Sequence, residues 1–372
     1  MSKKFSIFLS ALFCTFIGGV AVISLLLPDK DFSPLENRYL QDPPRLSLEN
    51  LNSGKFMEDA EDYVSDHIVG RDFWVAAKAW SERLSGKKES NGVYFGAQDT
   101  LINRVDTPSQ AKLDKDMGYL DTLVGNMSVP VYFGLIPSAA EIWKDRLPEG
   151  APTADEKAII DKLYFSTGAS VIDLYGALAP HSGEDLYYRT DHHWTSLGAF
   201  YGANAILEAM GLKPLELDSY QKTTVTDQFY GTSFSTSGVR WLPPDSIDTY
   251  VPGDGVKVTS YFNGAPEEGS LYVDSKLEVK DKYSYFLGGN QALCVIETEH
   301  TDAPSVLVVR DSYTDSLAPF LTERFSKIHL FDLRYNLTSI QSYVEEHDID
   351  TVIVLYSFSN FASDDKLFLL AR

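Results

Sequence analysis

Cysteine is scarce in this chain of 372 residues, which contains only Cys14 and Cys294. Cys14 lies in an apolar N-terminal stretch and Cys294 lies far along the chain, so we expect no disulfide within one folded domain. Two thiols are also too few to build a zinc site. The fold must therefore depend on a hydrophobic core, and the length of the chain and its 44% of hydrophobic residues are sufficient for one.

Positive charge is also in short supply. Lys and Arg number 32 against 53 Asp and Glu, which gives a formal net charge of −21. Such a chain is repelled by phosphate backbones and by anionic lipid headgroups. No run of Lys and Arg overrides this charge, so the composition argues against nucleic acid as a partner.

Charge is absent altogether between Phe5 and Leu27, directly after two lysines. A helix of this length is about 30 Å long or slightly more, roughly the thickness of a bilayer core. The leading lysines favour a cytoplasmic N-terminus. We therefore expect residues 1–27 to be an uncleaved single-pass anchor in the cell membrane, with an extracytoplasmic globular domain. The alternative is a cleaved signal peptide, but its apolar region would be shorter, and no convincing small-residue cleavage site lies near Pro28.

The rest of the chain is predicted to be a linker over residues 28–50 and one α/β domain over residues 51–372. Polar residues and prolines mark the linker. In the domain, short apolar runs alternate with helical periodicity, which is typical of a parallel sheet with helices on both faces. The strands predicted on this basis are 129–136, 170–175, 305–311, 327–333 and 350–357. The predicted helices include 155–165, 196–211, 315–326 and 338–347, preceded by a helical stretch within 53–86.

Two segments depart from this alternation. "NGVYFGAQDTLI" is predicted to be a hairpin that turns at residues 96–99. Residues 213–290 are richer in Gly, Ser, Thr, Asp and Tyr, so we expect a β-rich insertion there.

Histidine is rare, with seven residues, yet two of them are adjacent in Asp191-His192-His193-Trp194. The segment precedes a predicted helix, for which Thr195 is a plausible N-cap. A serine nucleophile needs a base, and the base needs a carboxylate to orient it. Asp191 and His193 could supply both. A structural role for His193 is the alternative, and a metal site of Asp191, His192 and His193 is another. Such a metal site lacks the further His, Asp or Glu cluster that it would need.

Ser312 follows the strand predicted over 305–311 and precedes a helix. In an open parallel sheet, active sites lie beyond the carboxyl ends of the strands. A helix N-terminus there offers N–H groups and a positive dipole end to an oxyanion. A serine after a strand is more often a cap or a turn residue, so this position alone does not identify a nucleophile.

The segment "TDHHWTSLGAF" resembles the signature of the DHHW protein family, which is related to the SGNH-like proteins that O-acetylate alginate in the periplasm of Gram-negative bacteria. The resemblance runs from about residue 32 to the C-terminus. It is carried further by "FSPLENRYLQDPP", "NGVYFG", "FYGTSFSTSG", "KYSYFLGGN" and "VLVVRDSYTDSLAPFL". It implies an SGNH-hydrolase-like three-layer α/β/α fold. The order Asp, His, Ser is permuted, because ordinary SGNH hydrolases put the serine first.

The resemblance also implies roles for individual residues. Ser312 is the implied nucleophile, His193 its base and Asp191 the orienting carboxylate. Arg310 stands where the serine block of the family usually has glycine. Because arginine lacks the backbone freedom of glycine, the resemblance does not fix the geometry of the oxyanion hole.

Four further residues are predicted to bind the oxyanion or the substrate: Gly289, Asn290, Arg334 and Tyr356. The first two could supply donors, although a turn at the end of a strand explains them equally well. Arg334 follows a predicted strand and Tyr356 ends one, at the same edge of the sheet. His192 and Trp194 are expected to pack and position their loop.

The sequence thus predicts extracytoplasmic acyl transfer without a cofactor or a metal. Ser312 would take an acetyl group from a donor, and His193 would activate a hydroxyl of an exported or cell-wall polysaccharide. By analogy with the relatives, a multi-spanning membrane acyltransferase would be the partner that supplies the acetyl group. The alternatives are a carbohydrate esterase that uses the same triad, and a non-catalytic surface or assembly protein that keeps the fold.

Overall fold

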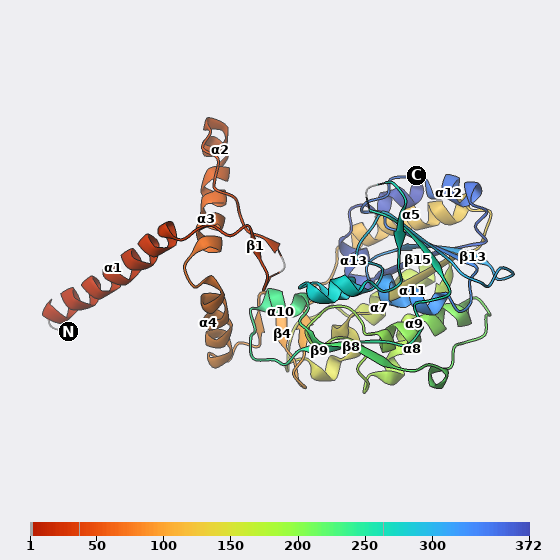
Figure 1. The fold of residues 1–372 in the computed structure, drawn as a ribbon, viewed down its shortest axis with the longest axis horizontal. Coiled ribbons are helices and arrows are strands. Elements are labelled where there is room, and N and C mark those ends of the chain that lie inside the picture. The colour runs from red at the N-terminus through yellow and green to blue at the C-terminus, as the bar shows by residue number, and fades with distance from the viewer. Residues whose placement is uncertain (1–2, 37, 263) are drawn as a thin grey trace. The chain divides into compact units, whose positions relative to one another are not determined.

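The structure is a computed structural model, and it describes residues 3–36, 38–262 and 264–372. Contacts within the chain define two compact units, each described by itself below (Figure 1). The first unit comprises Met1–Asn91 and Ser235–Trp241, and the second comprises Gly92–Phe234 and Leu242–Arg372.

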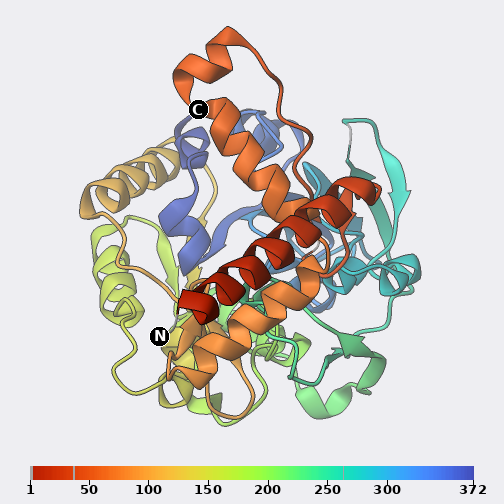
Figure 2. The ribbon, with the colours of Figure 1, turned by 90° about the vertical axis from the view of Figure 1, so that its left-hand side faces the viewer.

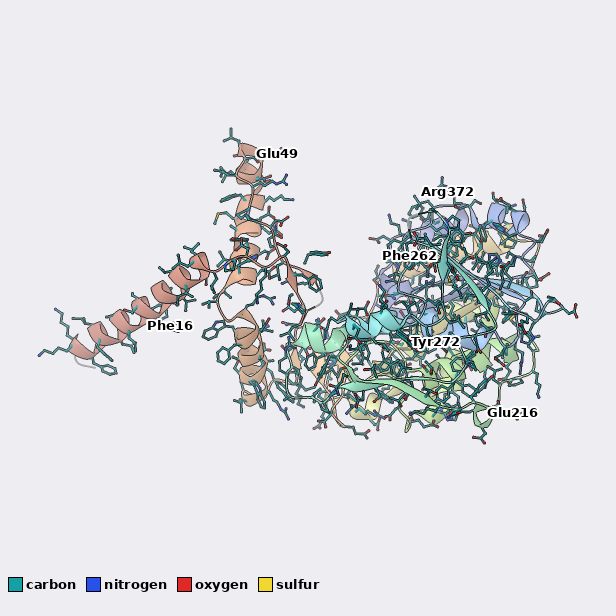
Figure 3. All side chains as sticks on the ribbon, in the orientation of Figure 1. Phe16, Glu49, Glu216, Phe262, Tyr272 and Arg372 are labelled. Atoms are coloured by element: carbon teal, nitrogen blue, oxygen red, sulfur yellow. The ribbon has the colours of Figure 1, made fainter. Side chains whose placement is uncertain are left out.

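The first unit begins with helix α1 (Lys3–Leu26), none of whose residues is buried (Figure 3). By length and composition, α1 could cross a membrane. The predicted helical stretch is two helices, α3 and α4, because the chain turns between them and Gly70 has a φ of 70°. The remaining elements of the unit, with these two, are β1 (Phe32–Ser33), β2 (Arg38–Tyr39), α2 (Leu48–Ser53), α3 (Lys55–His67), α4 (Arg71–Leu84) and β3 (Glu89–Ser90).

The predicted linker contains some regular structure. Strands β1 and β2 pair antiparallel inside it. The Arg38 guanidinium donates a hydrogen bond of 2.8 Å to Oδ2 of the Asp66 carboxylate, near the end of α3. The ribbon is thereby tied to the helices that follow it.

The second unit contains an eight-stranded sheet in the order β11-β10-β12-β14-β13-β15-β6-β7. The five strands from β14 to β7 are parallel. The other three are antiparallel, so the sheet has the predicted parallel part and, in addition, an antiparallel edge. The strands are β6 (Val131–Ile136), β7 (Ser170–Ile172), β10 (Lys257–Tyr261), β11 (Glu267–Gly269), β12 (Leu293–Glu297), β13 (Ser305–Arg310), β14 (Lys327–Phe331) and β15 (Thr351–Ser357).

Strand β15 is the middle one of the five parallel strands, between β13 and β6. Ile353 is paired with Val308 on one side and with Tyr132 on the other. Every residue of β15 is buried, as expected for an apolar strand covered on both faces.

Helices cover both faces of the sheet, which confirms the predicted fold class. Figure 1 shows α5 and α12 on one side and α8 and α9 on the other, and α9 packs on α11 and α8. The predicted N-cap is confirmed, because Thr195 Oγ1 accepts a hydrogen bond of 3.3 Å from Gly198 N at the start of α9. The helices of the unit are α5 (Gln110–Asn126), α6 (Ala139–Ile142), α7 (Glu156–Ser166), α8 (Leu174–Leu178), α9 (Ser196–Ala209), α11 (Thr314–Leu321), α12 (Ile340–Glu346) and α13 (Phe358–Ser363). A further helix, α10 (Thr232–Ser237), runs across the boundary between the units.

The predicted hairpin and the β-rich insertion are both present. Strands β4 (Val93–Phe95) and β5 (Leu101–Asn103) pair antiparallel around a turn in which Gln98 and Asp99 have positive φ angles. The insertion supplies the paired strands β8 (Thr223–Phe229) and β9 (Asp245–Thr249). It also supplies β10 and β11, which explains why the sheet has an antiparallel edge.

Candidate active site

The loop that carries Asp191 and His193 is a short antiparallel turn. Tyr187 forms a β-bridge with Trp194, and Tyr188 N donates to the carbonyl of His193 over 3.2 Å. The buried indole of Trp194 donates to the carbonyl of Tyr313, over 2.9 Å. The tryptophan thus fixes this loop against the loop that carries the serine.

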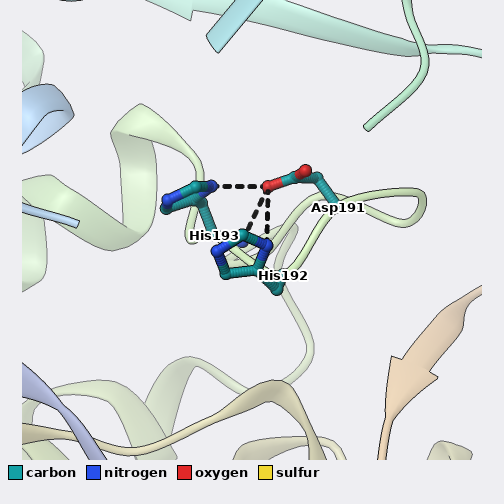
Figure 4. Close-up of side chains that lie close together, drawn as sticks. All are labelled: Asp191, His192 and His193. Atoms are coloured by element: carbon teal, nitrogen blue, oxygen red, sulfur yellow. Dashed lines mark hydrogen bonds and ion pairs between the residues drawn. The ribbon is translucent and has the colours of Figure 1, made fainter. Parts of the chain in front are cut away.

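The structure brings Asp191, His193 and Ser312 together. His193 Nδ1 lies 2.6 Å from Asp191 Oδ1, and His193 Nε2 lies 2.7 Å from Ser312 Oγ. Asp191 and His193 are 3% and 6% exposed. A carboxylate oxygen can only accept, so in the neutral imidazole Nδ1–H donates to Asp191, and Nε2 accepts from the serine hydroxyl. Figure 4 shows Asp191 with the two histidines beside it.

Asp191 is held by more than its histidine. Its Oδ2 accepts from Thr232 N over 2.7 Å and from Thr232 Oγ1 over 3.0 Å, while Oδ1 also accepts from His193 N over 2.9 Å. Burial alone would raise the pKa of this carboxyl, but the two imidazoles and the hydrogen bonds hold that pKa well below its usual value. A Cβ on Gly231 would lie 2.2 Å from Cβ of Asp191, so only glycine fits at that position.

His192 faces a different partner. Its Nδ1 lies 2.6 Å from Thr232 Oγ1, and about a third of its side chain is exposed. Burial and the neighbouring His193 lower the pKa of His192 to about 4, so this imidazole is neutral at pH 7.

The same three residues are the group that could hold a metal ion, since their ligand atoms lie within 4.8 Å of one another. The carboxylate of Asp191 already accepts four hydrogen bonds, and His193 Nε2 already faces Ser312. A cation would have to break several of these bonds to bind. The arrangement therefore fits a triad better than a metal centre.

Tyr283 contacts both halves of the site. Its ring stacks on the imidazole of His193, with ring centres 3.8 Å apart and an angle of 9° between the planes. Its hydroxyl donates to the carbonyl of Ser312 over 3.0 Å and lies 3.1 Å from Ser316 Oγ. Burial raises the pKa of this hydroxyl well above its usual value, so it stays a donor.

The serine loop is anchored by its own neighbour, Asp311. Oδ1 of this carboxylate accepts from Tyr313 N over 3.1 Å. Oδ2 accepts from Ser357 N, Ser357 Oγ and Asn360 Nδ2 over 2.8, 2.7 and 2.7 Å. Asp311 thereby ties the end of β13 to the end of β15 and to α13, and it fixes the position of Ser312 between β13 and α11.

Arg310 is the last residue of β13, and its φ angle is not positive, so this position does not need glycine. Its side chain is fully buried, and Nη1 lies 2.8 Å from Oδ1 of Asp315 in the first turn of α11. Burial raises the pKa of the Asp315 carboxyl to about 6, with Arg310 opposing the rise. The arginine thus leaves the strand-to-helix geometry at Ser312 intact.

The other four predicted residues lie apart from the triad contacts. Asn290 and Arg334 are brought together, since Arg334 Nη2 donates to Asn290 Oδ1 over 3.1 Å, and Arg334 is also paired with Asp332 at 2.6 Å. Gly289 has a φ of 104° and lies in a turn. The Tyr356 hydroxyl is buried and has no hydrogen-bond partner in the described part of the chain. None of the four forms a hydrogen bond with Ser312 among the residues that the structure describes.

Sequence reasoning missed the roles of Thr232, Tyr283 and Asp311. The first two lie in "FYGTSFSTSG" and "KYSYFLGGN", segments that resemble the DHHW family but had no role assigned. Asp311 stands beside the predicted serine. A residue-by-residue reading of these segments against the loop at Asp191 could have pointed to them.

Helices on both faces of a sheet with five parallel strands, and a Ser-His-Asp group beyond the carboxyl ends of those strands, are features of an SGNH-like fold. A family model described as "DHHW protein" matches residues 121–331, which is more than half of the chain, and the chain therefore belongs to the DHHW family. No curated protein matches the chain.

Solved structures share the fold. A DHHW family protein from Eubacterium siraeum has a TM-score of 0.68 and 24% identity, over 76% of this chain and 95% of that one. PatB1 of Bacillus cereus has a TM-score of 0.60 and 22% identity, over 73% and 97%, and it has also been solved with a sulfonyl adduct. The O-acetyltransferase domain of Pseudomonas putida AlgJ matches with a TM-score of 0.46 and 14% identity, over 73% and 93%. The first two structures, both below 25% identity, show that the fold is shared and nothing more.

Proposed function

We propose that this protein is an SGNH-like O-acetyltransferase that acts outside the cytoplasm on an exported or cell-wall polysaccharide. The observation that carries the proposal is His193, which lies within hydrogen-bond distance of both Asp191 and Ser312. Membership of the DHHW family and the placement of the serine at a strand-to-helix turn support it.

The proposed reaction has two steps. Ser312 Oγ attacks the carbonyl carbon of an acetyl ester while His193 Nε2 takes its proton, and Asp191 stabilises the imidazolium. The carbon–oxygen bond to the donor then breaks, and His193 returns the proton to the departing alkoxide, which leaves an acetyl-serine. In the second step a sugar hydroxyl gives its proton to His193 and attacks the acetyl group. The bond between the acetyl carbon and Ser312 Oγ then breaks, His193 returns the proton to Oγ, and the acetylated sugar leaves.

The proposed location follows from α1. The helix is long and apolar enough to cross a membrane, and the two lysines with which it begins favour a cytoplasmic N-terminus. The domain would then face the exported polysaccharide, and a multi-spanning membrane acyltransferase would supply the acetyl donor.

The test is covalent labelling of Ser312. Since PatB1 has been solved with a sulfonyl adduct, a sulfonyl fluoride is a suitable probe for this chain too. We expect one adduct on the peptide that carries Ser312 in the wild-type protein, and none in Ser312→Ala. Ser339→Ala, at the half-buried N-cap of α12, is the control and should be labelled like the wild type. An unchanged adduct in Ser312→Ala would contradict the proposal.

Transferase and esterase use the same residues and differ in the acceptor. The purified protein would be incubated with an acetyl ester and a glycan, and acetylated glycan would be compared with free acetate. Free acetate alone would identify an esterase. The complete absence of an acyl-enzyme would favour a non-catalytic surface or assembly protein.

A further inference from the structure

The first unit exposes a band of apolar side chains on α4. Phe73, Trp74, Trp80 and Leu84 are 65%, 40%, 43% and 81% exposed. Phe73, Trp80 and Leu84 are seven and then four residues apart, so they lie on one face of the helix. We call these four residues the α4 band.

The other side of α4 is covered within the same unit. Ala79 is fully buried. A Cβ on Gly238 would lie 2.8 Å from Cγ1 of Val75, which shows how closely that segment approaches. Trp241 packs on one edge of the band, 4.4 Å from Trp80 between ring centres. The band is therefore what remains uncovered after the unit has packed.

Trp74 connects the band to α1. Its ring meets the ring of Phe16 edge to face, with centres 6.2 Å apart, and Val69 N donates to Ser24 Oγ over 2.9 Å. Figures 1 and 2 show α1 and α4 leaving a common junction, and Figure 3 labels Phe16 on α1.

The contact between Trp74 and Phe16 bears on how deep Trp74 lies in a bilayer. Phe16 precedes the end of α1 at Leu26 by about 15 Å of helix axis. When α1 spans an apolar core about 30 Å thick, Phe16 lies near the middle. A side chain that touches Phe16 must then reach below the membrane surface.

The charged residues of α3 and α4 also favour α4 as the helix nearer the membrane. The α4 segment has more basic than acidic residues, against the strongly acidic character of the whole chain: Arg71, Lys78 and Arg83 with Asp72 and Glu82, followed by Lys87, Lys88 and Glu89. The α3 segment is acidic: Glu58, Asp59, Glu61, Asp62 and Asp66 with Lys55. A helix with aromatic and aliphatic residues on one face and basic residues beside them is typical of a membrane interface.

We propose that α4 is a second membrane contact, with the α4 band inserted into the interface of the outer leaflet beside α1 and with α3 in water. The occupant of the band is the lipid bilayer. This inference rests on the α1 anchor of the proposed function, and the experiment therefore includes a separate measurement on α1.

The full chain would be reconstituted into vesicles of phosphatidylcholine and phosphatidylglycerol. Nitroxide labels would be placed in a Cys14→Ser background, in which the remaining Cys294 is buried. The α4 labels are Ser81→Cys and Leu84→Cys, the α3 controls are Met57→Cys and Val64→Cys, and Phe8→Cys reports on α1. The measurement is the ratio of collisions with oxygen, which concentrates in lipid, to collisions with a water-soluble nickel chelate.

We expect this ratio to be several-fold higher for the α4 labels than for the α3 controls, whose side chains are as exposed. Equal ratios on α3 and α4, with a high ratio at Phe8, would overturn the second contact and leave the anchor in place. A low ratio at Phe8 would show that α1 is not in the membrane and would overturn both.

Discussion

At the scale of single residues, adjacent histidines are oriented toward different partners. His193 faces Ser312, whereas His192 faces Thr232. We expect His193→Ala to lower turnover of an acetyl ester on the order of 10⁴-fold, because the members of a triad act as a unit. His192→Ala should lower it on the order of tenfold or less.

The assay is release of a chromophore from the ester, with the melting temperature of each variant as the control for folding. Equal losses at the two histidines would contradict the triad. They would favour a metal centre, which metal analysis of the purified protein would then test.

Tyr283 positions the base through its ring and the serine loop through its hydroxyl. Tyr283→Phe keeps the ring and loses about 1 kcal/mol of hydrogen bonding, so we expect a turnover loss of a few-fold. Tyr283→Leu also loses the stack on His193, so its turnover should be lower again, on the order of ten-fold below that of Tyr283→Phe. Separate kcat and KM values check this, since positioning of the base predicts a change mainly in kcat. Equal losses in the two variants would show that the stack does not matter.

At the scale of elements, strand β14 carries a buried histidine that links stability to pH. Burial, with the nearby His347 and Lys327, lowers the pKa of His329 to about 4 in the folded chain, against about 6.5 in the unfolded chain. The unfolded state therefore binds more protons between these values, and stability falls as the pH drops from about 6.5 toward 4. The loss from this residue is on the order of 3 kcal/mol at most.

Thermal melting between pH 4 and 7 checks this dependence. His329→Asn should flatten it, with the exposed His300→Asn as the matched control. An unchanged slope in His329→Asn would contradict the role of this histidine. His192, whose pKa is also lowered to about 4, would add a dependence of the same sign in both variants.

The elements also show what sequence could and could not predict. Apolar runs such as "SVLVVRD" placed β13 and β15 within a residue or two, because buried strands depend on local composition. The antiparallel edge was not predicted, since β10 and β12 pair across about 30 residues of insertion. The triad was assembled by resemblance, and its geometry depends on contacts between residues 191–193 and 312. Thr232 and Tyr283 were missed because a hydroxyl or a ring carries no local signal of its distant partner.

At the scale of the whole molecule, attachment to the membrane depends on whether α1 is retained or cleaved. We expect the membrane-extracted protein to retain residues 3–26, because the apolar stretch is longer than that of a signal peptide. Intact-mass analysis measures this directly. A mature N-terminus near residue 28 would show that the segment is removed.

The position of β15 sets the order in which the molecule can be completed. This strand is the last of the sheet in the sequence, yet it lies between β13 and β6, in the middle of the five parallel strands. Strands β6 and β13 are separated by well over a hundred residues, and both pair with β15. They can therefore be joined into one sheet only after residues 351–357 have been synthesised. Such distant pairing is slow to form, and the incomplete sheet exposes two unpaired edges meanwhile. A chain exported from its N-terminus would thus remain vulnerable to aggregation and proteolysis until almost its last residue has emerged, and a premature stop just before residue 351 would be as damaging as a much shorter product.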